Sequence, residues 1–218
     1  MVQKQLSYKY QVYSEIKKGI LMGQYQPGSV MNERKLSEEL GISRTPIREA
    51  LQMLARDGWL QMETYKGAIV REFDAHYMWE LVRIRYALEL SAVEDAVRNM
   101  TEEELVNLRK IQTEQKEDLL NYDVDDFIQH DRDFHSCIYQ MSRNGELMKL
   151  ASNYYDVFRF LGKQAVLGTD ERRITTIEEH QAILAAVENR NIEEAVSAMK
   201  VHMEHTEENI RRHIKLAP

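Results

Sequence analysis

Four side chains in the last two thirds of the chain have the types and the spacing of a metal site. Asp131 and His135 lie four residues apart, so they would share one face of a helix. His180 and His202 each lie among apolar residues of two further segments with helical spacing. Three imidazoles and one carboxylate suit Zn²⁺, Ni²⁺, Fe²⁺ or Mn²⁺ and leave one or two positions for water or a ligand. Three helices of a bundle could therefore direct these four side chains toward one divalent ion.

The spacing alone is also compatible with purely structural roles for the same residues. A lone histidine on a helix is usually a surface or hydrogen-bonded core residue, and Asp131 could pair with Arg132 or face solvent. The same part of the chain holds further histidines that could be mistaken for ligands: His76, His130, His205 and His213. Cys137 lies two residues after His135, so it would point elsewhere on the helix, and we expect it to pack in the core.

The first third of the chain carries a pattern suited to DNA. Two short segments with helical spacing, Glu33–Leu40 and Arg44–Arg56, meet across Gly41-Ile42-Ser43. A short turn with glycine between two helices is typical of a helix-turn-helix. Ser43 or Thr45 is expected to cap the second helix, because a hydroxyl can accept a hydrogen bond from the first amides.

The predicted second helix begins with residues that can contact DNA. Arg44, Thr45 and Arg48 would lie at or near its N-terminus, which is the end of a recognition helix that enters the major groove. Arginine there can bond O6 and N7 of a guanine together, or hold phosphates. An ordinary helical hairpin with surface arginines is the alternative interpretation.

The segment from about residue 8 to residue 71 resembles the GntR family of bacterial transcription regulators. The matching motifs are Pro27-Gly28, Leu36-Ser37, Leu40-Gly41-Ile42-Ser43-Arg44-Thr45-Pro46-Ile47-Arg48-Glu49-Ala50-Leu51, Leu54-Ala55-Arg56-Asp57-Gly58, Lys66-Gly67 and Val70. The resemblance implies a winged helix-turn-helix domain. The DNA contacts that it implies are Arg34, Arg44, Thr45, Arg48, Lys66 and Gly67.

The rest of the chain, about residues 74–213, resembles the ligand-binding FCD domain of the FadR subfamily, in its shorter, VanR-like form. The matching motifs are Asp131-Arg-Asp-Phe-His135, Glu179-His180-Gln-Ala-Ile183, and Ala195, Met199 and His202 on the last helix. In metal-binding members, the ligands are an Asp and a His four apart and one His on each of the last two helices. The resemblance thus implies a metal held by Asp131, His135, His180 and His202. It does not extend to the long-chain acyl-CoA ligand of FadR.

Arg85-Tyr-Ala-Leu-Glu89 matches the first-helix pattern of the same domain. A buried arginine would offer a planar fork to a carboxylate effector. An intrahelical Arg85–Glu89 pair, worth only ~0.2–0.5 kcal/mol, is an equally good interpretation. Arg159 and Lys163 are further candidates for an acidic ligand, and the aromatic residues at 154–160 are expected to lie mainly in the core.

The spacing of the apolar residues and the positions of glycine and proline predict a mainly α fold with two domains. The first, residues 1–72, is a winged helix-turn-helix in which Tyr8–Met22 forms a helix and Trp59–Met62 and Ala68–Arg71 form a hairpin. The second, residues 73–218, is an antiparallel all-α bundle of about six helices. These helices are expected near 74–98, 101–120, 123–142, 145–166, 171–189 and 191–213. Thr101-Glu-Glu-Glu104 predicts a capping box at the start of the second of them.

The composition agrees with a helical globular chain and argues against several fold classes and kinds of metal site. Only nine Gly and three Pro occur in 218 residues, which argues against a sandwich or barrel, and one Cys excludes a multi-Cys metal site. No apolar run approaches the ~20 residues that span a bilayer, and no signal-peptide core is present, so a cytoplasmic location without membrane contact is expected. The net charge of −7 hides a basic first part, with 11 Lys and Arg against 7 Asp and Glu in residues 1–71.

These features together predict a ligand-responsive, DNA-binding transcription regulator and not an enzyme. A small organic acid bound at the metal and at Arg85 would alter operator binding by a homodimer on a palindromic site. The alternatives are a regulator that senses the metal itself, a purely structural metal, and a metal-dependent hydrolase. For the last of these, the sequence places no general base beyond the metal ligands themselves and contains no nucleophile elbow.

Overall fold

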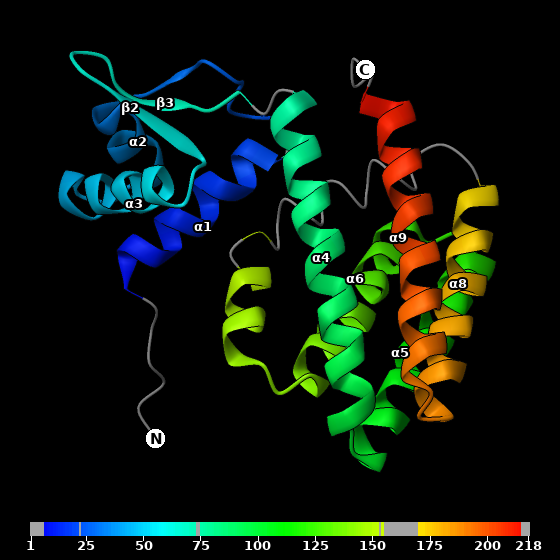
Figure 1. Cartoon of the computed structure of the whole chain (residues 1–218). Helices are drawn as coiled ribbons and strands as arrows, with labels where there is room; N and C mark the ends of the chain where they lie inside the picture. The colour runs from blue at the N-terminus through cyan, green and yellow to red at the C-terminus, as the bar shows by residue number, and fades with distance from the viewer. Residues whose placement is uncertain (1–6, 22, 73–74, 153, 155–169, 215–218) are drawn as a thin grey trace. The chain divides into compact units, whose positions relative to one another are not determined.

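The computed structural model describes residues 7–21, 23–72, 75–152, 154 and 170–214 (Figure 1). Its contacts divide the chain into two compact units, Met1–Asp74 and Ala75–Pro218. The first unit is built from helices and a small sheet, and the second is helical. Each unit buries its own apolar residues.

The N-terminal unit is a winged helix-turn-helix. Its elements are α1 (Tyr8–Leu21), β1 (Val30–Met31), α2 (Glu33–Leu40), α3 (Arg44–Arg56), β2 (Leu60–Glu63) and β3 (Gly67–Val70). The antiparallel sheet has the order β1-β3-β2, with Leu60 opposite Val70 and Glu63 opposite Gly67. Helix α1 packs on α3, and Ile16, Ile47 and Trp59 are buried in this core. The prediction contained two strands, so β1 was missed.

The ends of α2 and α3 follow local capping rules. Asn32 is the N-cap of α2, and its Oδ1 accepts hydrogen bonds from the amides of Arg34 and Lys35 at 2.9 and 3.1 Å. Gly41 ends α2 in the left-handed region at φ 65°, which glycine adopts without strain. Ser43 occupies the N-cap position of α3, but within the described part of the chain its hydroxyl makes no capping hydrogen bond. The predicted side-chain cap by Ser43 is therefore wrong.

The C-terminal unit is a bundle of long helices. They are α4 (Ala75–Asn99), α5 (Glu102–Asn121), α6 (Val124–Met141), α8 (Asp170–Glu188) and α9 (Ile192–Ile214), and residues 145–152 are also helical. Helix α4 packs on α6 and α9, and α5 packs on α6 and α8. The predicted helices 74–98, 101–120, 123–142, 171–189 and 191–213 agree with these bounds within two residues. Most of the predicted helix 145–166 lies outside the described residues.

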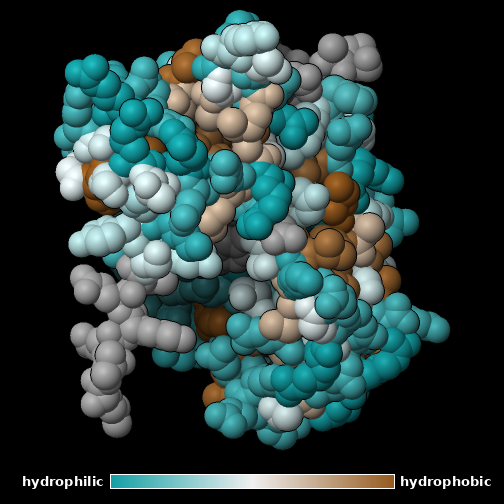
Figure 2. Space-filling model, turned by 90° about the vertical axis from the view of Figure 1, so that its left-hand side faces the viewer, coloured by the Kyte–Doolittle hydropathy of each residue, from teal (hydrophilic) through white to brown (hydrophobic). Residues whose placement is uncertain are grey.

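The bundle contains an extended apolar core and a smaller buried cluster formed by Phe127, Ile128 and Ile177. The buried members of the extended core include Val93, Phe134, Ile183 and Met199 from four helices, together with Cys137, as expected. The predicted capping box is confirmed: Thr101 and Glu104 exchange hydrogen bonds at the start of α5. The face drawn in Figure 2 is mostly hydrophilic, with smaller apolar areas between the polar side chains. None of the described helices is both long enough and apolar enough to cross a membrane.

Candidate functional site

Three helices of the bundle bring three buried histidines together. They are His135 on α6, His180 on α8 and His202 on α9, with 4%, 0% and 2% of their surface exposed. One potential ligand atom from each lies within 4.8 Å of the other two. The Nε2 atoms of His135 and His202 are 3.2 Å apart. Phe134 stacks on the His180 ring with 4.1 Å between ring centroids, which helps to hold that ring in place.

A hydrogen bond orients each imidazole through its Nδ1 atom. The acceptors are Glu89 Oε2 for His135 at 2.9 Å, Gln115 Oε1 for His180 at 2.8 Å and Glu179 Oε2 for His202 at 2.7 Å. An ionised carboxylate can only accept, so Nδ1 carries the proton in His135 and His202. The same assignment holds for His180, because the amide nitrogen of Gln115 donates to the carbonyl of Phe127. In this neutral tautomer, an imidazole presents the lone pair of its Nε2 to the common centre.

This arrangement fits a cation. Two Nε2 lone pairs that face each other at 3.2 Å repel unless a proton or a metal ion lies between them. The Nε2 atom of His180 is buried and has no hydrogen-bond partner among the described residues, and such a group is costly to bury unless something binds it. A set of three neutral imidazoles with oriented Nδ1 atoms is the donor set that divalent transition metals prefer.

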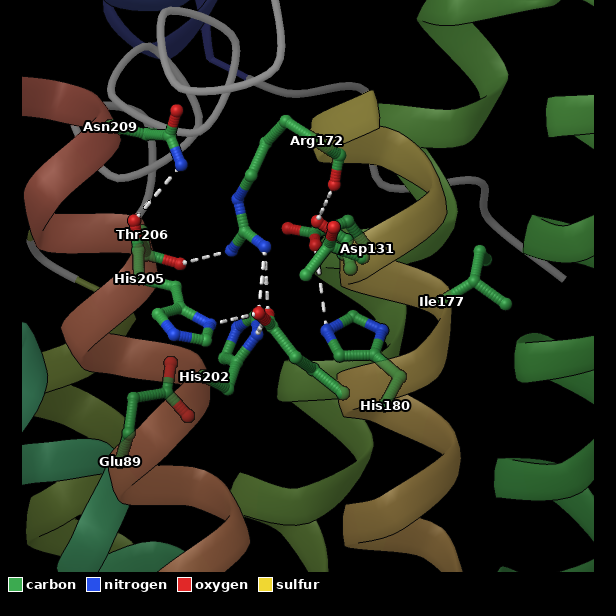
Figure 3. A network of polar contacts seen from close by, with 12 residues as sticks. Glu89, Asp131, Arg172, Ile177, His180, His202, His205, Thr206 and Asn209 are labelled. Atoms are coloured by element: carbon green, nitrogen blue, oxygen red, sulfur yellow. Dashed lines mark hydrogen bonds and ion pairs between the residues drawn. The ribbon is translucent and has the colours of Figure 1, made fainter. Parts of the chain in front are cut away.

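Asp131, the fourth predicted ligand, lies beside the three histidines. It is one helical turn before His135 on α6, and its side chain is 19% exposed. Its Oδ1 atom is 3.6 Å from His180 Nε2, and Figure 3 shows the two side chains next to each other. The three histidines form the close cluster of ligand atoms, and the Asp131 carboxylate borders that cluster.

Two of the histidines belong to matching Arg–Glu–His arrays. In the first, Arg85 Nε donates to Glu89 Oε1 at 3.2 Å, so the intrahelical pair that the spacing allowed is present. In the second, Arg172 Nη1 donates to both oxygens of Glu179 at 2.9 Å. Its Nη2 donates to Thr206 Oγ1 at 3.0 Å (Figure 3). Each glutamate thus links an arginine to the imidazole that it orients.

Sequence reasoning missed Gln115 and Arg172 and assigned no role to Glu179. The available signal was charge on an apolar helix face, because Arg172, Thr176 and Glu179 recur at the spacing of one side of α8. All three of these α8 side chains are buried. A buried charged residue is unusual without a partner, so such a pattern can indicate a polar network.

Burial and neighbouring charges set the protonation of the site. Burial lowers the pKa of His180 well below 6.5, and repulsion from the charged forms of His202 and His135 and from Arg172 and Arg85 lowers it further. Burial also lowers the pKa of His202, although its hydrogen bond to Glu179 opposes the shift. Burial raises the pKa of Glu89, but interactions with His135 and Arg85 outweigh this and bring it to about 2. His180 and His202 therefore favour the neutral form that can bind a metal, and the Glu89 carboxylate beside His135 stays charged.

The remaining candidates of this unit have other surroundings. His130 Nδ1 is 2.5 Å from Asp118 Oδ2, His205 Nδ1 is 2.6 Å from Glu179 Oε1, and His76 Nε2 is 3.4 Å from Glu80 Oε1. Arg159 and Lys163 lie outside the described residues, as does the predicted aromatic cluster apart from Tyr154. The side chain of His213 is also outside the described part.

The residues expected to contact DNA lie on the surface of the N-terminal unit. Arg44, Thr45 and Arg48 fall in the first five residues of α3, and the side chains of the two arginines are 61% and 58% exposed. Arg34 on α2 pairs with Glu38 at 3.0 Å. Lys66 lies in the turn between β2 and β3 and pairs with Glu63 at 2.7 Å, and Gly67 begins β3 with φ 86°.

Comparison with known proteins yields matches over both units. The family model of the bacterial regulatory proteins of the gntR family matches residues 9–70, and that of the FCD domain matches residues 80–205. The chain is 32% identical to the uncharacterized HTH-type transcriptional regulator YdhC of Bacillus subtilis, over 94% of this chain and 91% of that protein. It is 32% identical to the Uxu operon regulator of Haemophilus influenzae, over 87% and 76% of the two chains. The solved structure of E. coli McbR/YncC matches with a TM-score of 0.77 at 25% identity, over 95% and 99%.

Proposed function

The chain belongs to the GntR family of bacterial regulatory proteins, with a C-terminal FCD domain, and we propose that a small carboxylate bound at a divalent metal ion in this domain modulates its binding to operator DNA. The chain is a DNA-binding transcription regulator of this family and not an enzyme, so the hydrolase alternative is dropped. The metal, the effector and the residues that bind DNA are the parts that we propose.

DNA recognition is assigned to the surface around the start of α3. We assign base contacts to Arg44, Thr45 and Arg48, whose exposed side chains begin the recognition helix. Contacts with the phosphate backbone are assigned to Arg34, Lys66 and Gly67. One winged module contacts little DNA by itself, so two copies in a homodimer would bind a palindrome.

The metal site is assigned to His135, His180, His202 and Asp131. The observation that carries this assignment is the convergence of three buried Nε2 lone pairs, one of which has no hydrogen-bond partner among the described residues and faces the Asp131 carboxylate at 3.6 Å. Glu89, Gln115 and Glu179 keep the imidazoles in the tautomer that can bind a metal. A divalent ion there would supply positive charge and an open position for a carboxylate oxygen.

Arg85 is the proposed second contact of the effector. It is buried, and the charges of Glu89 and Asp131 raise its pKa in spite of that burial, so it remains a cation near Asp131. A planar guanidinium is suited to a carboxylate. Effector binding would change DNA affinity only to the extent that it favours one arrangement of the two DNA-binding units over another.

The test is to measure carboxylate binding with and without metal. Calorimetry with a panel of small mono- and dicarboxylates should detect binding to the metal-loaded protein and at least tenfold weaker binding after chelation. Arg85→Ala should weaken the binding while the metal content stays at the wild-type level. Equal carboxylate affinity of the two forms would leave the metal without a role in effector binding.

A metal-sensing regulator is the second candidate. It is favoured by the near-complete burial of the three histidines, because such a site can respond to the ion alone. Titration of the chelated protein with Zn²⁺, Ni²⁺, Fe²⁺ or Mn²⁺ during a DNA-binding measurement, with no organic acid present, distinguishes the two. A change in DNA affinity with metal alone supports the sensor.

A further inference from the structure

One carboxylate lies between the two exposed arginines of the recognition helix. Glu33 on α2 accepts hydrogen bonds from Arg48 Nε at 2.9 Å and from Arg48 Nη2 at 2.8 Å. It also accepts from Arg44 Nη2 at 3.2 Å. The Glu33 side chain is 26% exposed, much less than either arginine, so the carboxylate is partly shielded from solvent.

The contact orients Arg48 in a specific way. Glu33 takes the edge of the guanidinium formed by Nε and Nη2, and each oxygen accepts one of the two hydrogen bonds. The opposite edge, formed by Nη1 and the second proton of Nη2, is the fork that fits O6 and N7 of a guanine. A carboxylate on one edge therefore leaves the base-reading edge available and limits the rotation of a long side chain.

Glu33 is itself held in position by local structure. It is the first residue of α2, directly after the N-cap Asn32, and α2 packs on α3. A carboxylate in the first turn of a helix is stabilised by the helix dipole. The hydrogen bond from Arg48 is the main cause of the lowered pKa of Glu33, so this carboxylate remains charged at neutral pH.

We propose that Glu33 is a positioning residue for DNA recognition, which orders Arg48 and Arg44 for base contacts and offsets part of their charge. The inference depends on the proposed DNA contact of Arg48. Ordering the side chain before binding reduces the entropy lost on the correct sequence. The negative charge of Glu33 reduces attraction to phosphates of any sequence. Both effects raise the ratio of specific to non-specific affinity.

The test uses a duplex selected from a random pool by the wild-type protein and a scrambled duplex of the same length. Glu33→Gln keeps the size of the side chain and removes its charge. We expect about tenfold weaker binding to the selected duplex. Binding to the scrambled duplex should be unchanged or tighter. Its affinity should fall more steeply with salt concentration, by about one released counterion.

Two controls separate positioning from general charge and from folding. Glu39→Gln removes the same charge from the same helix, where Glu39 pairs with Lys35 at 3.5 Å, and should leave the affinity ratio unchanged. In an Arg48→Ala background, Glu33→Gln should lose most of its effect on the selected duplex, whereas an effect through misfolding would persist.

Three results would overturn the inference. If Glu33→Gln and Glu39→Gln change the affinity for both duplexes by the same factor, Glu33 acts only as a general surface charge. Weaker specific binding by Arg48→Ala together with wild-type behaviour of Glu33→Gln would leave the DNA site intact and remove the role of Glu33. No effect of Arg48→Ala would remove the proposed contact itself, and the inference with it.

Discussion

Both units of the chain use a glutamate to hold a functional side chain, but they do so in opposite environments. In the N-terminal unit, Glu33 holds two arginines that are more than half exposed. In the bundle, Glu89 and Glu179 hold His135 and His202 where almost no surface is exposed. In both units a glutamate carboxylate accepts the hydrogen bond, but the contacts of Glu33 are exposed to water and those of the bundle glutamates are not.

This difference decides what each contact can contribute. Exposed ion pairs add little stability, because water and salt screen them, so Glu33 is suited to orientation. A buried carboxylate loses its hydration and must be fully bonded, which explains why Arg85 and Arg172 accompany the two bundle glutamates. We expect substitutions in the bundle to affect folding and metal binding, and substitutions around α3 to affect only DNA binding.

The largest expected effect is the loss of metal from the bundle. His180→Ala combined with His202→Ala removes two of the three convergent Nε2 atoms, so stoichiometric metal should disappear in elemental analysis of protein loaded with Zn²⁺ or Ni²⁺. The matched control is His76→Ala with His130→Ala, and His205→Ala should also retain the metal. Full metal occupancy in the His180→Ala, His202→Ala variant would disprove the site.

In the wild type, chelation should lower the melting temperature, because the ion binds only the folded state.

The next effect tests the contrast between buried and exposed pairs directly. Arg172→Leu leaves Glu179 buried without its guanidinium, and we expect a loss of about 3–5 kcal/mol in the free energy of unfolding. Arg98→Leu removes an exposed pair with Glu94 in the same unit and should cost about 1 kcal/mol or less. Urea unfolding measures both. Similar losses in the two variants would contradict the comparison.

DNA binding should respond to the α3 arginines without a change in stability. Arg48→Ala is expected to weaken binding to a selected operator about tenfold to hundredfold at fixed salt, because one bidentate base contact is lost. Lys66→Ala should instead weaken binding to all DNA sequences. The affinity of this variant should depend less steeply on salt concentration, by about one released counterion. The melting temperatures of both variants should equal that of the wild type. Wild-type operator affinity of Arg48→Ala would contradict its assignment.

The last expected effect is a gradual pH dependence of the stability of the metal-free protein. The pKa values of His180 and His202 are lowered in the folded state, so the unfolded chain binds more protons as the pH falls below about 6.5. Stability should then decrease toward pH 5, by at most about 1.4 kcal/mol per pH unit for each histidine. The lowered pKa of Glu89 adds a further loss only below about pH 4.5. Urea unfolding of His180→Gln should show a smaller slope between pH 6.5 and 5, and an unchanged slope would exclude His180 as its source.

Local sequence was sufficient for several elements. The predicted bounds of α2 and α3 are those of the structure, because Gly41 and the residues around Asp57 and Gly58 end the two helices. The capping box at Thr101 was also predicted, since both of its partners lie within four residues. Strand β1 was missed because two residues show no alternation, and it exists only through pairing with β3. The hydroxyl of Ser43 makes no cap although its position was correct.

The types and spacing of Asp131, His135, His180 and His202 follow from the sequence, and a 3.6-residue period places the first two on one helix face. Which atoms of these side chains meet was decided only by tertiary packing. Gln115 and His180 are 65 residues apart, and His135 and Glu89 are 46 apart, so no local pattern predicts that they orient each other. The same holds for Glu33 and Arg48, which are 15 residues apart. Helix packing brings such partners within hydrogen-bond distance, and burial then requires every polar group to be bonded.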